Sequence, residues 1–510
     1  MKTAVVVGVG PVRWLGGCLL MLILVACISV PFDYPREESY RGARVETGSL
    51  AALSDLWLSN NAHNTAVYPL GGGADAYAVR LDLIERAQAT IDAQYFLIKP
   101  DAAGIGFTGA LLRAAYRGVR VRLLLDDIFT TAKDEGLALL NAHDNVQVRL
   151  FNPLSRQGFT SLNYLADFKR ANRRMHNKSF TVDGQITIIG GRNIAGEYFE
   201  MNPAVDFWDF EILSFGGLIG EVGDSFDDFW NHELSLPMQA FDSETNPKEL
   251  ESVRTELAEW RRTHPGNQLS TADGIIAGLL DKRLQPYFAE AHVISDHPDK
   301  LVNPVSREFQ LLASSLGSLI LAAETEIVVF SPYFIPNQGL ADLFVAKQQE
   351  GVKVDILTNS LASTNHVAVH SGYKRYRKTL LQGGVGLWEV SAHAANPGTD
   401  ITTTLHTKAI MFDRRWLFVG SLNVDPRSID INTEMGLILD SPELTRDLHA
   451  AAADTVRKYA YKVELTPDGS LKWLALRDGK EISFNKEPES SWWRRFSAGL
   501  YGLLPIEGQL

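Results

Sequence analysis

The sequence predicts an α/β fold built from two copies of one unit that share a single site. Three observations support this prediction: a chain of 510 residues, which is too long for one compact core, a strand–helix–strand pattern that occurs twice, and a polar motif repeated in the same frame. Apolar residues make up 45% of the chain and charged residues 22%, which is typical of a globular protein and excludes a largely disordered or polytopic one.

The repeated unit begins with a β-rich run, continues through an amphipathic stretch and ends in a second strand. Residues 88–127 hold the first copy, with Tyr95 at the end of its first run, and residues 323–360 hold the second, with Tyr333 at the corresponding end. A strand–helix–strand unit of this kind predicts parallel strands with right-handed crossovers. We expect Tyr95 and Tyr333 to lie at equivalent positions in the core beneath the site.

A polar motif with the spacing His-x-Lys-x4-Asp follows each copy. Its residues are His176, Lys178 and Asp183 in the first copy and His406, Lys408 and Asp413 in the second. Asn193 follows His176 at the same interval as Asn423 follows His406, and a glycine precedes each asparagine at the same offset. A single His-x-Lys tripeptide is usually a solvated strand face, whereas two copies with identical offsets indicate one shared site.

These paired motifs resemble the motif pair of the phospholipase D superfamily. From about Ala74 to the C-terminus, the chain resembles the bacterial cardiolipin synthase branch of that superfamily, and the C-type branch in particular. Its local markers here are Phe151-Asn-Pro153, Asn172-Arg-Arg-Met-His-Asn-Lys178, Leu357-Thr-Asn-Ser-Leu361, Ser421-Leu-Asn-Val-Asp-Pro-Arg427 and Asn432-Thr-Glu434. The resemblance implies two phospholipase D-like domains, each a mixed sheet flanked by helices, with pseudo-twofold symmetry and one active site at their interface.

The motif residues suit phosphoryl chemistry. Positions two apart on a strand face the same side, so each histidine and its lysine are expected to project together. One imidazole can then attack phosphorus while the other protonates the leaving oxygen, and the lysines with Asn193 and Asn423 can bind the non-bridging oxygens. No metal or other cofactor is expected. The resemblance favours His176 as the nucleophile and His406 as the acid and then the base.

The carboxylates of the motif region have different expected tasks. Asp183 and Asp413 are grouped with the catalytic residues, but each lies an odd number of positions beyond its histidine, so a positioning role is expected. The family places a carboxylate behind each catalytic histidine to orient the ring. Glu434 matches that position in the second copy. Asp209 is the choice in the first copy, with Asp206 and Glu211 as close competitors.

The first thirty residues read as an export signal. The only charges are Lys2 and Arg13, and an apolar run precedes Cys27. Leu24-Val-Ala-Cys27 resembles a lipobox, in which the cysteine is lipidated; an uncleaved membrane anchor is the alternative. Either places the protein at a membrane of the bacterial cell envelope. The second cysteine, Cys18, lies in the same stretch, which excludes a disulfide framework, a cysteine-ligated zinc and a thiol nucleophile in the folded body.

Two further segments have two interpretations each. Residues 365–376 predict a helix with His366, His370 and Tyr373 on one face, suited to lipid head-group recognition or to ordinary packing. Residues 491–504 combine aromatic, aliphatic and arginine side chains at helical spacing, as in a segment that lies in a bilayer interface or docks onto the protein's own body.

The predicted organisation has five parts. They are the signal or anchor (1–30), an N-terminal phospholipase D-like domain (45–240), a connection with an amphipathic helix near residues 250–260 (241–300), a C-terminal phospholipase D-like domain (301–462) and a tail with a candidate interfacial helix (463–510).

The resemblance implies a phosphatidyltransferase that moves a phosphatidyl group to phosphatidylglycerol and makes cardiolipin. The donor is a second phosphatidylglycerol or phosphatidylethanolamine, and the membrane surface is an expected partner; no accessory protein can be named. Hydrolysis to phosphatidic acid is the main alternative, a nuclease is a weaker one, and a binding protein with a dead site is disfavoured because both motifs are intact. Lys and Arg number 49 against 61 Asp and Glu, and this acidic balance argues against nucleic acid as a partner.

Overall fold

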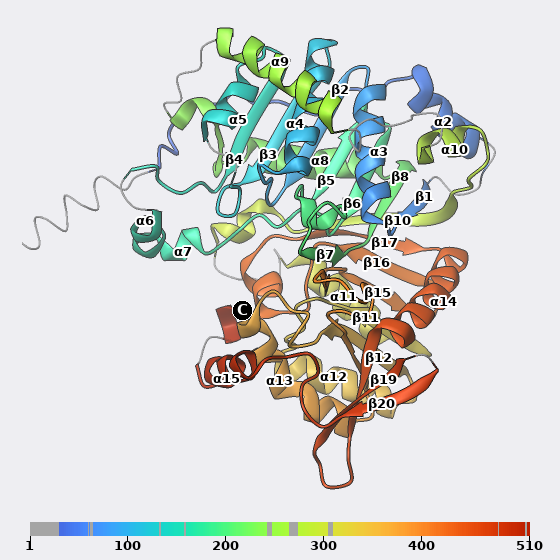
Figure 1. Cartoon of the computed structure of the whole chain (residues 1–510). Helices are drawn as coiled ribbons and strands as arrows, with labels where there is room; N and C mark the ends of the chain where they lie inside the picture. The colour runs from blue at the N-terminus through green and yellow to red at the C-terminus, as the bar shows by residue number, and fades with distance from the viewer. Residues whose placement is uncertain are drawn as a thin grey trace, which may run out of the picture.

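The computed structural model describes residues 30–59, 61, 65–131, 134–157, 160–241, 247–264, 274–303, 310–477, 479–504 and 507–509. One mixed sheet runs through both halves of the chain, with helices on its two faces (Figure 1). Cys27 and the expected export signal lie outside the described residues. Within the described ranges, no helix combines the length and the apolar character needed to cross a bilayer.

Eight strands form the sheet of the first half, in the spatial order β9, β4, β3, β2, β5, β6, β8, β1. The strands β4, β3 and β2 are parallel and the other neighbours are antiparallel. Their bounds are β1 Thr65–Leu70, β2 Thr90–Tyr95, β3 Arg120–Asp126, β4 Val146–Phe151, β5 Ser179–Val182, β6 Ile186–Gly190, β8 Glu211–Gly216 and β9 Ser235–Pro237.

The second half repeats this order and adds strands at its outer edge. The sequence of neighbours is β10, β17, β16, β15, β11, β12, β13, β18, β19, β20, with β11, β12 and β13 parallel. Their bounds are β10 Tyr287–Ser295, β11 Glu326–Phe330, β12 Lys353–Asn359, β13 Gly386–Val390, β15 Ala409–Phe412, β16 Trp416–Gly420, β17 Met435–Asp440, β18 Ala460–Leu465, β19 Leu471–Arg477 and β20 Lys480–Phe484. Antiparallel pairing of β1 with β10 joins the two halves.

Helices cover both faces of each half. In the first half α3, α4 and α5 pack on one face and α8 on the other, and in the second half α11, α12 and α13 lie opposite α14. The helices are α2 Gly48–Leu58, α3 Gly73–Arg86, α4 Ala102–Tyr116, α5 Asp134–Asn141, α6 Thr160–Ala166, α7 Phe168–Ala171, α8 Ile219–Asn231, α9 Pro247–Thr263, α10 Ile275–Leu280, α11 Leu311–Ala322, α12 Gln338–Gln349, α13 Val367–Gln382, α14 Pro442–Tyr459 and α15 Trp492–Tyr501. Short turns of other helix types are η1 Gly196–Tyr198, η2 Met238–Phe241, η4 Pro298–Leu301, η5 Arg427–Ile431 and η6 Glu507–Gln509.

Successive residues of one strand pack against opposite faces of the sheet, so both faces carry apolar side chains that helices cover. Ile327 and Val329 of β11 belong to the core under α11–α13, whereas Val328 and Phe330 face the cluster under α14. That second cluster also contains Val67 from the first half, so a continuous apolar core joins the halves. The predicted α/β architecture with two repeated units is confirmed.

The repeat boundaries differ from the sequence-based ones in two places. Residues 241–300, expected to be a connection, contain β10 as well as α9, and β10 pairs with both halves of the sheet. Residues 463–510, expected to be a tail, contain most of the β18–β20 meander, which extends the second sheet. One face of each of these strands is exposed, so polar residues alternate with apolar ones. This mixed composition is why the segments were expected to be a connection and a tail.

The two tyrosines do not occupy equivalent positions, contrary to the sequence-based expectation. Asp183 donates its backbone N–H to the carbonyl of Thr90 and Asp413 to that of Glu326, which places Tyr333 opposite Leu97 in the repeat and not opposite Tyr95. Tyr95 is buried and accepts a hydrogen bond from Arg80 Nε at 3.1 Å. Tyr333 instead lies beside the site.

Candidate active site

A two-stranded parallel ladder between the halves sets the position of His406. The strands are β7 (Val205–Trp208) and β14 (Thr402–Leu405), and Leu405 pairs with Trp208 at their ends. His406 then donates its backbone N–H to the carbonyl of Trp208 at 2.7 Å. The next residue of the first half is Asp209, so the ladder brings this carboxylate to the histidine of the other half.

The other histidine is positioned in the same way with the halves exchanged. Met175 forms a parallel bridge with Thr433, and His176 donates its backbone N–H to the carbonyl of Thr433 at 3.0 Å. Glu434 follows directly. Each histidine is therefore placed beside a carboxylate from the opposite half of the chain.

The side chains complete this crosswise pairing. His176 Nδ1 lies 2.8 Å from Glu434 Oε2, and His406 Nδ1 lies 2.6 Å from Asp209 Oδ2. All four groups are buried. The sequence had paired histidines with Asp209 and Glu434 without indicating that the partners cross between halves. Of the two competitors, Glu211 is bound instead by Arg80 and Arg192 in the core.

The competitor Asp206 lies on β7, three positions before Asp209. Among the described contacts, its carboxylate has none with a histidine ring. Its pKa is raised because the side chain is partly buried and lies near Glu200.

The ends of β3 and β12 hold the residue before each histidine. Asp126 accepts a hydrogen bond from the backbone N–H of Met175 at 2.9 Å, and Asn359 accepts one from Leu405 at 2.8 Å. Burial raises the pKa of Asp126 to about 6 against the opposing effect of the Arg174 guanidinium. The repeated polar residue at these strand ends thus fixes the approach of the chain to each histidine.

Small residues make room for the carboxylates. A Cβ atom at Gly191 would lie 2.2 Å from Asp209 Oδ1, so only glycine fits there. The equivalent residue in the second half is Ser421, whose hydroxyl donates to Glu434. The glycine before it is repeated in both halves for a similar reason, since a Cβ at Gly420 would lie 2.4 Å from the carbonyl of Met435.

The two lysines are buried beside the histidines. Lys178 donates to the carbonyl of His176, and Lys408 Nζ lies 2.8 Å from His406 Nδ1. Burial lowers the pKa of Lys178 to about 7, against the attraction of Glu434 and with the repulsion of Lys408. Burial lowers the pKa of Lys408 to about 8, against the attraction of Asp209. A bound anion would stabilise the charged form of both lysines.

Both imidazoles have pKa values well below 7. Burial lowers the pKa of His176 to about 4, with Glu434 opposing the shift and Lys178 adding to it. Burial lowers the pKa of His406 to about 3, with Lys408 adding to the shift and Asp209 opposing it. A neutral imidazole whose Nδ1 is held by a carboxylate presents Nε2 as a nucleophile or base.

The two asparagines keep free hydrogen-bonding capacity. Asn193 donates from Nδ2 to the hydroxyl of Tyr198 at 2.9 Å, and Asn423 lies against Ser428. Both amide oxygens are buried and have no hydrogen-bond partner in the described part of the chain. An amide oxygen only accepts a hydrogen bond, so these two atoms suit a ligand hydroxyl group, and a phosphate oxygen would have to be bound by the Nδ2 groups.

Aromatic rings surround the histidines, and sequence reasoning did not identify most of them. Phe96 meets His176 edge to face, with ring centroids 4.9 Å apart. Phe207 stacks on His406 at 5.1 Å, and Tyr198 and Tyr333 contact the same ring edge to face at 5.0 and 6.4 Å. The clustering of aromatic residues just before Asp209 was the available signal.

Asp183 and Asp413 lie away from this cluster, at the far ends of β5 and β15. Asp183 accepts hydrogen bonds from the backbone N–H groups of residues 88–90 at 2.8–2.9 Å. Asp413 does the same for residues 324–326, and these N–H groups hold its pKa below the ordinary value although burial alone would raise it. Grouping them with the catalytic residues therefore needs correction: the geometry gives them a structural role at the start of β2 and β11.

The helix predicted at residues 365–376 corresponds to α13, and its face is mostly internal. His370 and Tyr373 are buried, and Arg377 Nη2 lies 3.1 Å from His370 Nε2. Tyr373 lies 3.1 Å from Glu389 Oε1. These contacts favour packing over head-group recognition for both residues. His366 alone remains near the site, edge to face with Tyr333 at 5.4 Å.

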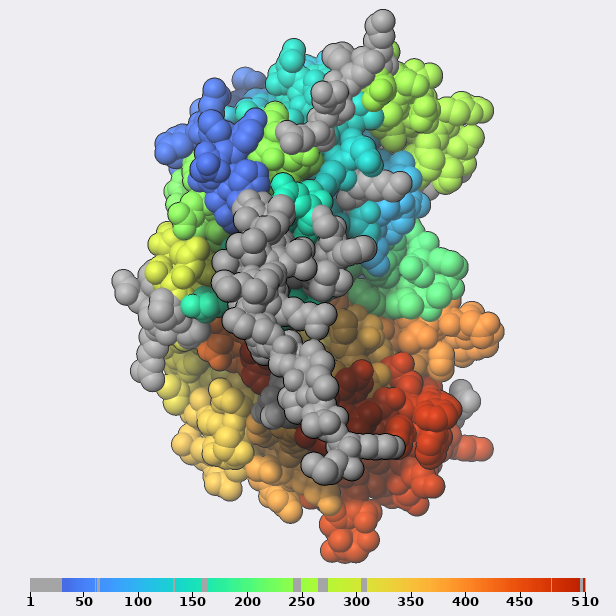
Figure 2. Space-filling model, turned by 90° about the vertical axis from the view of Figure 1, so that its left-hand side faces the viewer, coloured from blue at the N-terminus to red at the C-terminus, as the bar shows by residue number. Residues whose placement is uncertain are grey.

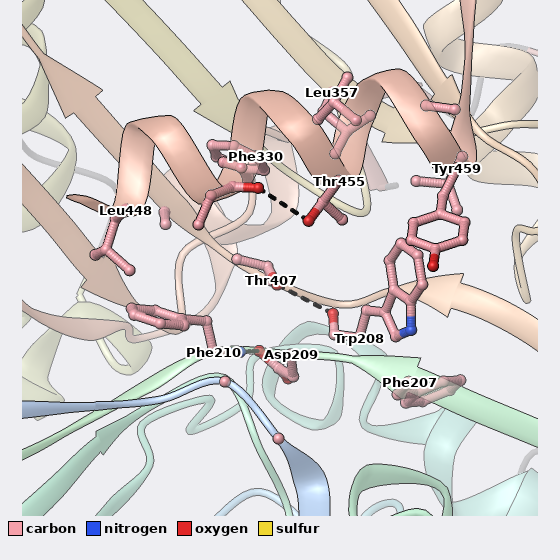
Figure 3. A pocket seen from close by; sticks show the side chains of 18 of the residues that line it. Phe207, Trp208, Asp209, Phe210, Phe330, Leu357, Thr407, Leu448, Thr455 and Tyr459 are labelled. Carbon is pink, nitrogen blue, oxygen red and sulfur yellow. Dashed lines mark hydrogen bonds between the residues drawn. The ribbon is translucent and has the colours of Figure 1, made fainter. Parts of the chain in front are cut away.

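An apolar cavity of about 440 Å³ lies behind the His406 segment, under α14 (Figure 3). Trp208, Asp209 and Thr407 line it together with Phe330, Leu357 and Tyr459, whereas neither histidine does. Asp209 therefore separates the histidine cluster from this cavity. In the described part of the chain, no three His, Cys, Asp or Glu side chains are grouped as a metal site.

Comparisons with known proteins show to which family the chain belongs. A family model described as "Cardiolipin synthase, PLD-like domain" matches residues 81–208 and 316–454, one segment in each half. Cardiolipin synthase C of Escherichia coli (strain K12) is 37% identical over 453 residues, which cover 86% of this chain and 95% of that protein. An uncharacterized protein of Helicobacter pylori is 30% identical over 491 residues, covering 94% and 96% of the two chains.

A solved structure is similar in fold. The crystal structure of a phosphatidylserine synthase from Haemophilus influenzae aligns with a TM-score of 0.55 and 14% identity, and the alignment covers 87% of this chain and 95% of that one.

Proposed function

Because the chain belongs to the cardiolipin synthase, PLD-like domain family and is a phospholipid phosphatidyltransferase of the phospholipase D superfamily, we propose that it transfers a phosphatidyl group to phosphatidylglycerol and thereby makes cardiolipin. The single observation that carries the proposal is the crosswise pairing of His176 with Glu434 and of His406 with Asp209. Two oriented imidazoles on one phosphate provide both a nucleophile and a proton carrier.

In the first step, Nε2 of His176 attacks the phosphorus of a glycerophospholipid. An N–P bond forms, the P–O bond to the headgroup breaks, and His406 gives its Nε2 proton to the departing alcohol oxygen. His406 is neutral in the free site, but a bound phosphodiester anion raises its pKa and allows it to carry this proton. Lys178, Lys408 and the Nδ2 groups of the two asparagines donate hydrogen bonds to the non-bridging oxygens.

In the second step, His406 acts as a base. It takes the proton of a phosphatidylglycerol hydroxyl, whose oxygen attacks phosphorus, forms the new P–O bond and breaks the N–P bond. His176 is released as a neutral imidazole. Water in place of this hydroxyl would give phosphatidic acid through the same residues.

We expect kcat/KM to fall as the pH rises from about 7 to about 9. The lysines must be charged to bind a phosphodiester anion, and burial brings their pKa values to about 7 and 8. Below these values both ammonium groups are charged, and above them both lose their protons, so a decrease of about tenfold or more is expected. In Lys178→Arg the guanidinium stays charged, so the decline of the residual activity should begin at a higher pH than in the wild type. A profile that is flat to about pH 9 contradicts the assignment.

Lipid products decide between transfer and hydrolysis. The purified full chain is supplied with phosphatidylglycerol alone and with added phosphatidylethanolamine, and the products are separated. The proposal expects cardiolipin in at least one mixture, together with glycerol or ethanolamine from the donor. Phosphatidic acid without cardiolipin refutes the synthase assignment and leaves a phospholipase D. The mixture that yields cardiolipin identifies the donor.

A further inference from the structure

Large apolar side chains lie exposed at the C-terminal end of the chain. On α15 and the turn after it, these are Trp492, Trp493, Phe496, Leu500, Leu503 and Leu504. Trp493 is 69% exposed and Leu503 81% exposed. Scattered exposed apolar residues are normal, but a contiguous group of this size on one helix indicates a surface that is covered in use.

The same helix is anchored on its inner side to the wall of the site. Arg494 donates to the carbonyls of Leu361 and Thr364 at 2.9 and 2.6 Å. The next residue of that loop, Asn365, accepts a hydrogen bond from Tyr333, whose ring faces His406. Arg494 thus binds the loop that precedes Asn365, while the aromatic side chains of the same helix are exposed to solvent.

The end of the chain also reaches the other half. Asn172, directly after α7, donates from Nδ2 to Gln509 Oε1 at 2.7 Å, and it is four residues from His176. The helices α6, α7 and α15 lie on one side of the molecule, at the left in Figure 1. Figure 2 looks onto this side, where the dark-red C-terminal residues lie near the boundary between the halves.

The first half contributes exposed apolar side chains on the same side. Leu165 of α6 and Phe168 of α7 are exposed, and Phe129 is 54% exposed in the loop after β3. The ring of Phe129 packs on Phe96, which in turn contacts His176. One exposed aromatic ring of the first half, that of Phe129, is therefore separated from His176 by a single side chain.

The segment around Phe32 lies against α7 on the same side of the molecule. Arg170 of α7 lies over the ring of Phe32 at 5.0 Å. Only a few residues separate Phe32 from Cys27, the predicted lipid attachment point, and each spans at most about 3.5 Å. An anchor in the preceding sequence would thus hold α7 within about 20 Å of the bilayer.

Basic side chains border the apolar group. Lys169 of α7 and Arg375 and Lys378 of α13 are exposed, although the chain as a whole is acidic. Aromatic and aliphatic side chains flanked by lysine and arginine suit the interface of a bilayer that contains anionic lipids.

We propose that α15, the turn after it, and α6–α7 form a membrane-docking face that seats the side of the molecule next to the two histidines on an anionic bilayer. The inference rests on the proposed function in that the lipid substrate is then reached from the bilayer. It explains why Arg494 is used to fix the helix while six apolar side chains remain in solvent.

Fluorescence quenching tests the docking face independently of catalysis. The full chain is reconstituted into vesicles of phosphatidylglycerol and phosphatidylethanolamine, with or without bromine on the acyl chains. The emission of Trp492 and Trp493 is obtained as the difference between the wild type and the W492F/W493F variant. We expect brominated lipid to quench this difference about twofold or more. Equal emission in both vesicles overturns the proposal, and a pair of tryptophans covered by a second copy of the chain would give that result.

Activity measurements provide a second arm. In W493E/L500E, turnover of vesicle phosphatidylglycerol should fall about tenfold, whereas turnover of a monomeric short-chain phosphatidylglycerol should change less than twofold. Leu476→Glu is the matched control, because it places a charge on an exposed apolar position of β19 and should leave both rates unchanged. Equal losses on both substrates would overturn the docking role. A wild type inactive on both substrates contradicts the proposed function, while the quenching result still tests the face.

Discussion

Replacing His176 by asparagine is expected to abolish the covalent phosphohistidine and to lower the transfer rate by about 10⁴-fold or more. His406→Asn should lower the rate by a comparable factor and yet leave the adduct detectable, because the nucleophile remains and its breakdown lacks a base. The reason is the assigned division of work: His176 forms the N–P bond, and His406 carries the proton in each direction.

The measurement uses phospholipid labelled with radioactive phosphorus in the phosphodiester. Rapidly quenched protein is separated from lipid, and the acid-labile, base-stable label is counted for the wild type and both variants. Label on His406→Asn and none on His176→Asn supports the assignment. The opposite pattern exchanges the two roles, and label on neither variant argues against a covalent intermediate.

Changing either carboxylate to its amide should affect the two steps differently. Glu434 contacts the ring of His176 and Asp209 that of His406, so Glu434→Gln should slow mainly the formation of the adduct, whereas Asp209→Asn should slow both proton transfers of His406 and therefore both formation and breakdown. The expected losses are about 10²–10⁴-fold, since an amide can hold the ring in the wrong tautomer and no longer stabilises the imidazolium. The carboxylates raise the pKa of their histidines, so both variants should lower these pKa values further.

Pre-steady-state labelling separates the two effects. Glu434→Gln is expected to label slowly and reach a low plateau, whereas Asp209→Asn should label more slowly than the wild type and also lose the label slowly when phosphatidylglycerol is added. Asp206→Asn is the matched control, because Asp206 lies on β7 three residues from Asp209 and should behave as the wild type. The same defect in both variants would mean that the crosswise contacts do not assign one carboxylate to each histidine.

Much of the fold could be predicted from local patterns. The strand–helix–strand units and the two-residue spacing of His176 and Lys178 follow from short-range periodicity, and the α/β repeat was confirmed. The register of the repeat was wrong at Tyr333, because β2 and β11 continue into loops of different composition and the Tyr-Phe pairs coincide by chance. The strand β10 was missed since its exposed positions read as a polar connection.

The crosswise pairing could not be predicted from local patterns. It depends on the β7–β14 ladder and on the Met175–Thr433 bridge, which join segments about two hundred residues apart or more. The local periodicity of each segment does not indicate with which distant segment it pairs. The structural role of Asp183 and Asp413 was partly visible, since an odd spacing turned each away from its histidine.

Assembly of the site from both halves has a consequence for biosynthesis. Glu434 lies 258 residues after His176, and at about 5–20 residues per second its synthesis follows by roughly 10–50 s. During this interval the nucleophile exists without the carboxylate that orients it. A growing chain near a membrane is therefore expected to cleave the surrounding lipids at least about 100-fold more slowly than the finished protein, and a chain truncated before residue 434 should show the same loss without any separate inhibitor.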